Sequence, residues 1–137
     1  MVIPRLVSQA IAGQPLTVYG DGRQSRTFTY VIEVVEALTA LMDTETACGE
    51  VFNVGGTDEI TIGLLAERII EMTGSLSSIQ MIPYDQAFGK DFEDMQRRVP
   101  GIEKIKRLIG FEPKTDLDTI LTRVIEFTRR TPINQPL

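Results

Sequence analysis

The 137-residue chain contains no histidine and only one cysteine, Cys48. Without histidine it lacks the commonest general base, the histidine-assisted serine and cysteine nucleophiles, and the usual imidazole ligand for metals. A single cysteine excludes an internal disulfide and a cysteine-rich zinc site. Chemistry of these kinds is therefore excluded for this chain.

Positive charge is also scarce, since 14 lysines and arginines stand against 19 acidic residues and leave a net charge of −5. Nucleic-acid binding needs a basic face that neutralises many phosphates, so we expect no nucleic-acid partner. Any anion that binds must be small and held by a few local arginines. The apolar runs are too short to cross a membrane, and no basic-then-apolar leader opens the chain. We expect a soluble, cytoplasmic protein.

The apolar content of 42% and the charged content of 24% are ordinary for a folded domain. Apolar residues at helical spacing predict five helices, at residues 3–11, 31–42, 62–72, 102–109 and 117–125. Strand-like runs occupy residues 16–19, 50–54 and 79–82, residues 27–30 are extended, and residues 84–100 read as polar and irregular. The pattern indicates an α/β fold with too few strands for an independent sheet. The chain therefore reads as part of a larger fold.

The segment YGDGRQSR, residues 19–26, is the richest in candidate chemistry. A strand ends in a glycine turn that lets the backbone approach a ligand, and Arg26 follows it. A guanidinium presents a planar fork of donors that suits phosphate oxygens, so Arg26 is a candidate pyrophosphate clamp. The alternative is a plain turn with solvent-facing arginines, which spacing alone favours.

Arg97 and Arg98 form a second candidate, because they precede a predicted helix whose N-terminus offers unpaired N–H groups. The alternative is a polar surface loop. Two arginine loops could also grip one diphosphate from opposite sides, which strengthens both candidates.

Three other features carry less chemistry. Asp91, Glu93 and Asp94 lie in one run, which reads as a solvated acidic loop. Gly55-Gly56 follows a predicted strand but lacks the spacing of a phosphate loop, so it reads as a turn. None of the three tyrosines is followed four residues later by a lysine, so the pairing that lowers a catalytic tyrosine's pKa is absent.

Three blocks in order resemble the C-terminal half of the extended short-chain dehydrogenases/reductases that act on nucleotide sugars. They are IPRLVSQAIAGQPLTVYGDGRQSRTFTYVIEVVEAL, then EVFNVGG with EITIGLLAERIIEMTG, then RRVPGIEKIKRLIGFEPKTDLDTILTRVIEF. The likeness implies a nucleotide-sugar-binding portion at residues 1–130, a flexible tail at 131–137, and no N-terminal Rossmann half. The family includes UDP-glucose 4-epimerases, dTDP-glucose 4,6-dehydratases and UDP-glucuronate decarboxylases, which use NAD.

By resemblance, Arg26 and Arg98 would contact the diphosphate, while Thr17 and Tyr19 would offer backbone groups to the pyrimidine base. The chain departs from the family at Gly101, where an acid is usual, and at Glu33, which replaces an aspartate and is a poorer cap. The change at Gly101 weakens the ribose contact that the resemblance would otherwise assign.

No glycine-rich NAD loop and no Tyr-x-x-x-Lys occur in the chain. We therefore expect no catalysis and no bound NAD in this chain alone, and a nucleotide-sugar-binding role within an NAD-dependent epimerase or dehydratase. The rival hypothesis is a stand-alone, non-catalytic binding or assembly module. Without a Rossmann half, apolar surface on residues 31–42 and 51–54 should be exposed, so we expect a homo-oligomer.

Overall fold

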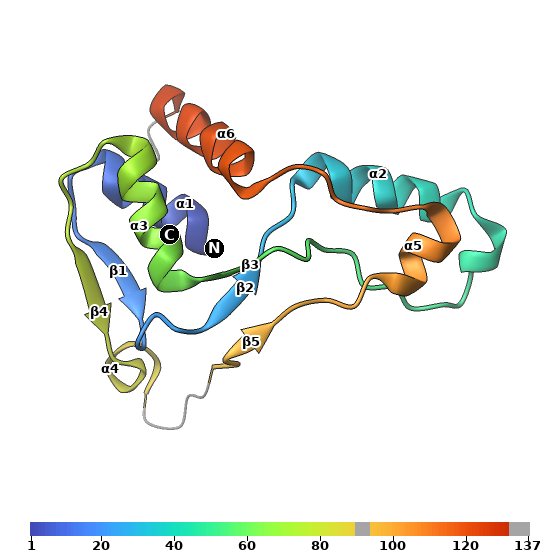
Figure 1. The fold of residues 1–137 in the computed structure, drawn as a ribbon, viewed down its shortest axis with the longest axis horizontal. Coiled ribbons are helices and arrows are strands. Elements are labelled where there is room, and N and C mark those ends of the chain that lie inside the picture. The colour runs from blue at the N-terminus through green and yellow to red at the C-terminus, as the bar shows by residue number, and fades with distance from the viewer. Residues whose placement is uncertain (90–93, 132–137) are drawn as a thin grey trace.

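The computed structural model describes residues 1–89 and 94–131 (Figure 1). The helices are α1 (Val2–Ile11), α2 (Val31–Met42), α3 (Ile62–Thr73), α4 (Tyr84–Phe88), α5 (Glu103–Ile109) and α6 (Leu117–Arg130), with a 3-10 turn, η1, at Glu45–Ala47. The strands are β1 (Leu16–Tyr19), β2 (Ser25–Thr27), β3 (Glu59–Thr61), β4 (Ile79–Ile82) and β5 (Arg97–Arg98). The α/β prediction is confirmed.

The main core lies where α1, α3 and α6 pack with the two-stranded parallel sheet of β1 and β4. Each helix presents one apolar stripe to it, as the spacing of the sequence predicts. Leu6, Leu65 and Leu121 from the three helices are fully buried, and so are Leu16 and Val18 of β1. This core anchors β1, the strand that leads into the YGDG turn.

Local signals set the helix ends. The Thr61 hydroxyl accepts a hydrogen bond from the backbone N–H of Leu64, and the Asp116 carboxylate accepts one from Thr119 at 2.7 Å. These side chains satisfy N–H groups that the first turn leaves unpaired. Gly74 closes α3 in the left-handed conformation, at φ 67°.

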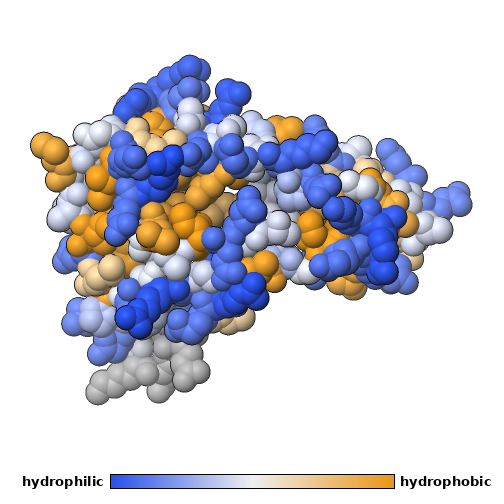
Figure 2. Space-filling model, viewed as in Figure 1, coloured by the Kyte–Doolittle hydropathy of each residue, from blue (hydrophilic) through white to orange (hydrophobic). Residues whose placement is uncertain are grey.

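A second, smaller cluster packs α2 against α5, through Ala37, Ile102, Ile105 and Phe111. In Figure 1 these two helices lie on the right, apart from the main core on the left. A three-stranded sheet of order β3–β2–β5 lies between the main core and the α2–α5 cluster (Figure 1). In this sheet, β2 is antiparallel to β3 and parallel to β5. Figure 2 shows apolar residues exposed on the surface of both groups of elements.

Two predictions about local structure were wrong. Residues 50–54 do not form a buried strand, and Val51 is 82% exposed. A strand needs a neighbour for its backbone hydrogen bonds, and no described strand pairs with this segment. Residues 84–100 are not irregular throughout, because they include α4 and β5.

Some predictions fall on residues outside the described ranges. Asp91 and Glu93 of the acidic run, and all but Thr131 of the tail at 131–137, are among these. Within the described part of the chain, no helix is long and apolar enough to span a membrane.

Candidate functional site

The YGDG turn delivers the chain from β1 into β2. Gly20 and Gly22 have φ angles of 71° and 73°, in the left-handed region that favours glycine. The Asp21 carboxylate accepts a hydrogen bond from the N–H of Arg23 at 3.0 Å, which tightens the turn. The Arg23 side chain is 87% exposed, whereas Arg26 lies in the middle of β2.

Arg26 and Arg98 lie side by side, because β2 and β5 pair in parallel with these two residues in register. Both arginines line a cavity of about 470 Å³. The other residues that line it are Thr27, Thr29, Asn53, Val54, Gly55, Val99, Pro100 and Gly101. The structure therefore brings the two candidate arginines together on paired strands, where sequence reasoning expected two loops.

Glu59 of β3 holds the three strands in this arrangement. Its carboxylate accepts a very short hydrogen bond from the hydroxyl of Ser25 in β2, and it pairs with the guanidinium of Arg97 in β5 at 3.0 Å. The Ser25 hydroxyl, and then Arg97, lower the pKa of Glu59 below its ordinary value. Glu59 therefore stays ionised and ties the strands on which Arg26 and Arg98 lie.

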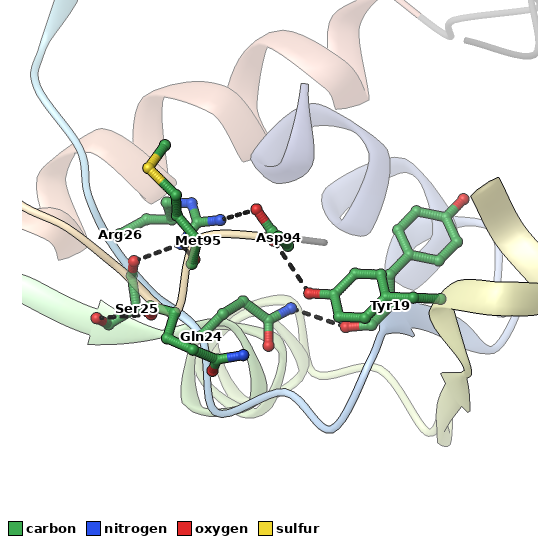
Figure 3. Close-up of polar contacts among 8 residues, drawn as sticks. Tyr19, Gln24, Ser25, Arg26, Asp94 and Met95 are labelled. Carbon is green, nitrogen blue, oxygen red and sulfur yellow. Dashed lines mark hydrogen bonds and ion pairs between the residues drawn. The ribbon is translucent and has the colours of Figure 1, made fainter. Parts of the chain in front are cut away.

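Arg26 is anchored by acceptors within the chain (Figure 3). Its Nη1 donates to the carbonyls of Ser25 at 2.7 Å and Met95 at 2.8 Å, and its Nη2 pairs with Asp94 at 2.6 Å. The side chains of Arg26 and Asp94 are only 18% and 26% exposed. The prediction of a solvated acidic loop is thus wrong for Asp94, since an ion pair draws its carboxylate inward.

Arg98 differs from Arg26 in its surroundings. It is exposed, and within residues 1–89 and 94–131 it forms no ion pair. An exposed guanidinium with unused donors is suited to an incoming anion. The cavity therefore offers one anchored cation and one available cation.

A second cavity, of about 180 Å³, adjoins the first, and Arg26 lines both. Its walls include the rings of Tyr19, Tyr84 and Phe88. The Arg5 guanidinium lies 4.4 Å from the centroid of the Tyr19 ring, and the Phe88 ring packs edge-on at 5.0 Å. Aromatic walls with a stacked guanidinium suit a flat, polar-edged ligand such as a nucleobase.

Both backbone groups of Thr17 and the carbonyl of Tyr19, which the resemblance assigned to the base, already have partners. The Thr17 N–H donates to Gln9 at 3.1 Å, and its carbonyl accepts from Arg5 at 3.1 Å. The Tyr19 carbonyl accepts from the Gln24 side chain at 2.7 Å (Figure 3). Tyr19 lines the smaller cavity, whereas Thr17 lines neither cavity. A base that used these groups would have to exchange with the chain's own side chains.

Tyr84 is not set up as a proton donor or acceptor in catalysis. Its hydroxyl donates to Asp94 at 3.0 Å, and burial, followed by the hydrogen bond to Asp94, raises its pKa to about 12. A catalytic tyrosine needs a pKa shift in the opposite direction. The phenol therefore stays protonated and acts as a hydrogen-bond donor.

Gly55 and Gly56 are close-packed within residues 51–58, where the structure has no turn, so the interpretation as a turn is wrong. A Cβ at Gly55 would lie 2.8 Å from Pro100, and one at Gly56 would collide with the Phe28 carbonyl. The Gly56 N–H donates to the Thr29 hydroxyl at 2.5 Å. These glycines allow tight packing within the chain, so they do not fit a dinucleotide-binding loop. Within the described residues, no group of three candidate ligands is placed to hold a metal.

The two departures from the family pattern have structural consequences. Gly101 accepts a hydrogen bond from Asn53 through its carbonyl at 3.3 Å, so the missing acid leaves only backbone at that edge of the larger cavity. Glu33 does not cap α2. It accepts from the N–H groups of Lys114 and Thr115 at 2.7 and 3.1 Å, and so ties α2 to the loop before α6.

Sequence reasoning missed Gln24 as a site residue. Gln24 is only 4% exposed and lines the smaller cavity, and its Oε1 is buried without a hydrogen-bond partner in the described part of the chain. Its place after a glycine turn carried no signal of burial. Asn53 lines the larger cavity.

A sequence model of the GDP-mannose 4,6 dehydratase family matches residues 1–124. The chain belongs to the extended short-chain dehydrogenase/reductase family. It is 39% identical to a UDP-N-acetyl-alpha-D-glucosaminuronate decarboxylase of Bacillus cytotoxicus over 93% of this chain and 40% of that one. It is 37% identical to UDP-glucuronic acid decarboxylase 1 of Danio rerio, over 94% of this chain and 29% of the relative. The chain thus spans less than half the length of these relatives.

Solved structures of this family share the fold. UDP-glucose 4-epimerase of Thermotoga maritima, solved with UDP-glucose, superposes with a TM-score of 0.84 at 26% identity, covering 96% of this chain and 40% of that one. A dTDP-glucose 4,6-dehydratase of Bacillus anthracis, solved with NAD, gives a TM-score of 0.82 at 27% identity over 96% and 40% of the two chains. The predicted resemblance is confirmed at the level of family and fold.

Proposed function

We propose that this chain binds a nucleotide-diphosphate sugar, as the substrate-binding portion of an NAD-dependent epimerase, dehydratase or decarboxylase. The observation that carries the proposal is the pairing of Arg26 with Arg98 across β2 and β5 on one cavity. Two guanidinium groups on neighbouring strands match the spread of negative charge on a diphosphate.

The adjoining aromatic cavity supports the same assignment. The base would lie near Tyr19 and Arg5, and the diphosphate would reach Arg26 and Arg98, because Arg26 lines both cavities. The sugar would then extend beyond the arginines, toward residues that this chain does not supply. Such remote binding energy orients the sugar for chemistry elsewhere in the enzyme.

The chain alone would be a binder and not a catalyst. NAD supplies the oxidation chemistry of the family, and the sequence has neither its glycine-rich loop nor a Tyr-x-x-x-Lys pair. We expect no turnover of UDP-glucuronic acid with added NAD. Measurable turnover by the purified chain would contradict this assignment.

The exposed face of α2 fits a contact with the rest of such an enzyme. Val31, Val35, Leu38 and Met42 recur on one side of the helix, and each is about half exposed or more. The Bacillus cytotoxicus relative has a further portion that no residue of this chain matches, since the match covers 40% of it. We propose that a Rossmann-type half covers this face in the full-length enzyme.

The binding assignment is tested by calorimetric titration of UDP into the 137-residue chain and into Arg98→Ala and Arg26→Ala variants. Arg23→Ala is a matched control, because Arg23 lies in the same segment but its side chain is 87% exposed. We expect each site variant to bind UDP roughly ten-fold or more weakly, as for the loss of a charge-assisted hydrogen bond. The control should bind as the unaltered chain does. Equal binding by the chain and both site variants would remove the arginines from the site.

A further inference from the structure

The Asp94 carboxylate is an anion already paired with Arg26. Its Oδ1 lies 2.6 Å from Nη2 of Arg26 (Figure 3). Both hydrogens of Nη1 point to backbone carbonyls, those of Ser25 and Met95. An arginine has five N–H donors, so only Nε and one hydrogen of Nη2 remain for a ligand. A bidentate grip on phosphate through these donors therefore uses Nη2, the nitrogen that already pairs with Asp94.

Asp94 also links the two cavities. Its Oδ2 accepts the hydroxyl hydrogen of Tyr84 at 3.0 Å, and both residues line the smaller cavity. Arg26, the partner on its other oxygen, lines both cavities. The carboxylate thus sits between the proposed diphosphate position and the proposed base position, with one oxygen committed to each side.

We propose that Asp94 is an internal anion that competes with the ligand's diphosphate for Arg26. When the diphosphate binds, it replaces the carboxylate at Nη2, and the hydroxyl of Tyr84 loses the acceptor that holds it against the smaller cavity. This inference rests on the proposed function, because it assigns the anion-binding role to the same arginine. By this inference, the Asp94 carboxylate lowers the affinity of the chain for every ligand that binds through Arg26.

The physical basis is an exchange of one anion for another. A charge-assisted hydrogen bond to Arg26 must break before a new one forms, so the net gain is smaller than at an unpaired arginine. After the exchange, Asp94 and the diphosphate are neighbouring anions and repel each other. Arg98 carries no such competitor among the described residues, so it makes the first contact and Arg26 the second.

The test is a calorimetric titration of UDP into the full 137-residue chain and its Asp94→Asn variant. Asparagine keeps the shape of the side chain and removes its charge, so Arg26 becomes available. We expect UDP to bind roughly ten-fold or more tightly to Asp94→Asn, as for one charged hydrogen bond that the ligand no longer has to replace. Glu112→Gln is the matched control, because it removes the same charge from a surface carboxylate paired with Lys106. It should bind UDP as the unaltered chain does.

Tyr84→Phe is a second variant that keeps the ring and removes the hydroxyl. Asp94 then loses one of its two holds, so we expect UDP binding to tighten by a smaller factor, roughly two- to ten-fold. A further readout needs no ligand. In Asp94→Asn, alkaline titration by ultraviolet absorbance should place the pKa of Tyr84 below about 12 but above its ordinary value, because burial is the larger cause of the shift.

The outcomes separate this inference from the binding assignment. Suppose that UDP binds the unaltered chain and that Arg98→Ala abolishes this binding. If Asp94→Asn then binds UDP no more tightly than the unaltered chain, the proposed competition is wrong and the binding assignment stands. Weaker binding by Asp94→Asn would also overturn it, since Asp94 would then orient Arg26 for the ligand. If UDP binds neither the chain nor any variant, both proposals fail.

Discussion

The exposed stripe on α2 predicts that the 137-residue chain self-associates in solution. Val31, Val35, Leu38 and Met42 are 63%, 52%, 49% and 86% exposed, and no charged residue interrupts their spacing along one side of the helix. Because they follow helical periodicity, two copies can bury the stripes against each other as antiparallel helices do. The perturbation is therefore the double substitution Val35→Glu with Leu38→Glu, at the centre of the stripe.

The magnitude follows from the exposures. Burying such a side chain fully from water contributes about 1.5–3 kcal/mol, so each half-exposed one contributes about 1 kcal/mol and the eight in a dimer contribute about 8 kcal/mol. Association costs at least about 4 kcal/mol in lost freedom. The net is therefore about −4 kcal/mol, which corresponds to a Kd of roughly 1 mM. The double variant removes half of the apolar contribution, about 4 kcal/mol, and should raise the Kd about a thousand-fold.

Sedimentation over a concentration series that reaches several times this Kd measures the effect. The unaltered chain should shift from monomer to dimer, and Val35→Glu with Leu38→Glu should remain monomeric throughout. Leu76→Glu is the control, because Leu76 is fully exposed in the loop between α3 and β4 and lies outside the stripe. A chain that stays monomeric at millimolar concentration would refute the reasoning. Equal disruption by the control would show that charge, and not the α2 stripe, sets the association.

Two further predictions concern stability, each measured by urea unfolding at fixed protein concentration. Gly20→Ala should lose about 2 kcal/mol or more, since a left-handed φ alone costs about 1–2 kcal/mol and its Cβ would collide with the Tyr84 ring. Gly13→Ala should lose only about 1 kcal/mol, because it has a similar φ with no atom within 4 Å of the Cβ. Hydrogen bonds from Arg68 lower the pKa of Asp118 in the folded chain. The ionised Asp118 therefore stabilises the folded state above the unfolded pKa, near 4, and this stabilisation is lost as the pH falls further. Asp118→Asn should therefore be less stable than the unaltered chain at neutral pH, with the difference shrinking below about pH 4.

The elements that the sequence predicted best are those whose signal is local. α1, α3 and α6 carry apolar stripes over ten or more residues, and the side chains of Thr61 and Asp116 cap α3 and α6. Periodicity and caps depend only on neighbours in sequence, so no tertiary information is needed to read them. β1 and β4 were found for the same reason, as short β-branched and apolar runs bounded by turns.

Residues 50–54 show where a local signal fails. Their apolar and β-branched residues are typical of a strand, yet a strand exists only where another strand pairs with it. No described strand does so here, and Val51 is left on the surface. Residues 50–54 therefore favour a strand by composition, but no described strand provides the backbone partners that a strand needs. α2 shows the milder form of the same effect, because the helix forms but the apolar stripe finds no partner.

The site itself rests on contacts between residues distant in sequence. β2, β3 and β5 are only three, three and two residues long, too short for an alternating pattern to reveal them. The register that places Arg26 beside Arg98, and the ion pair that places Asp94 on Arg26, come from tertiary pairing alone. The resemblance to a known family identified the two arginines as candidates, because its ordered motifs include both residues. Local sequence patterns do not show that the two lie together.

The short strands that carry Arg26 and Arg98 are held together by side-chain contacts as well as by backbone pairing. Glu59 of β3 contacts Ser25 of β2 and Arg97 of β5, and so ties both strands to one carboxylate. A site assembled from short strands needs such a tie, because backbone pairing over two or three residues contributes little stability by itself. The pairing of β2 with β5 places Arg26 beside Arg98 on one cavity, as an anion site requires. The features that make this region hard to predict from sequence are thus those that suit it to bind a charged ligand.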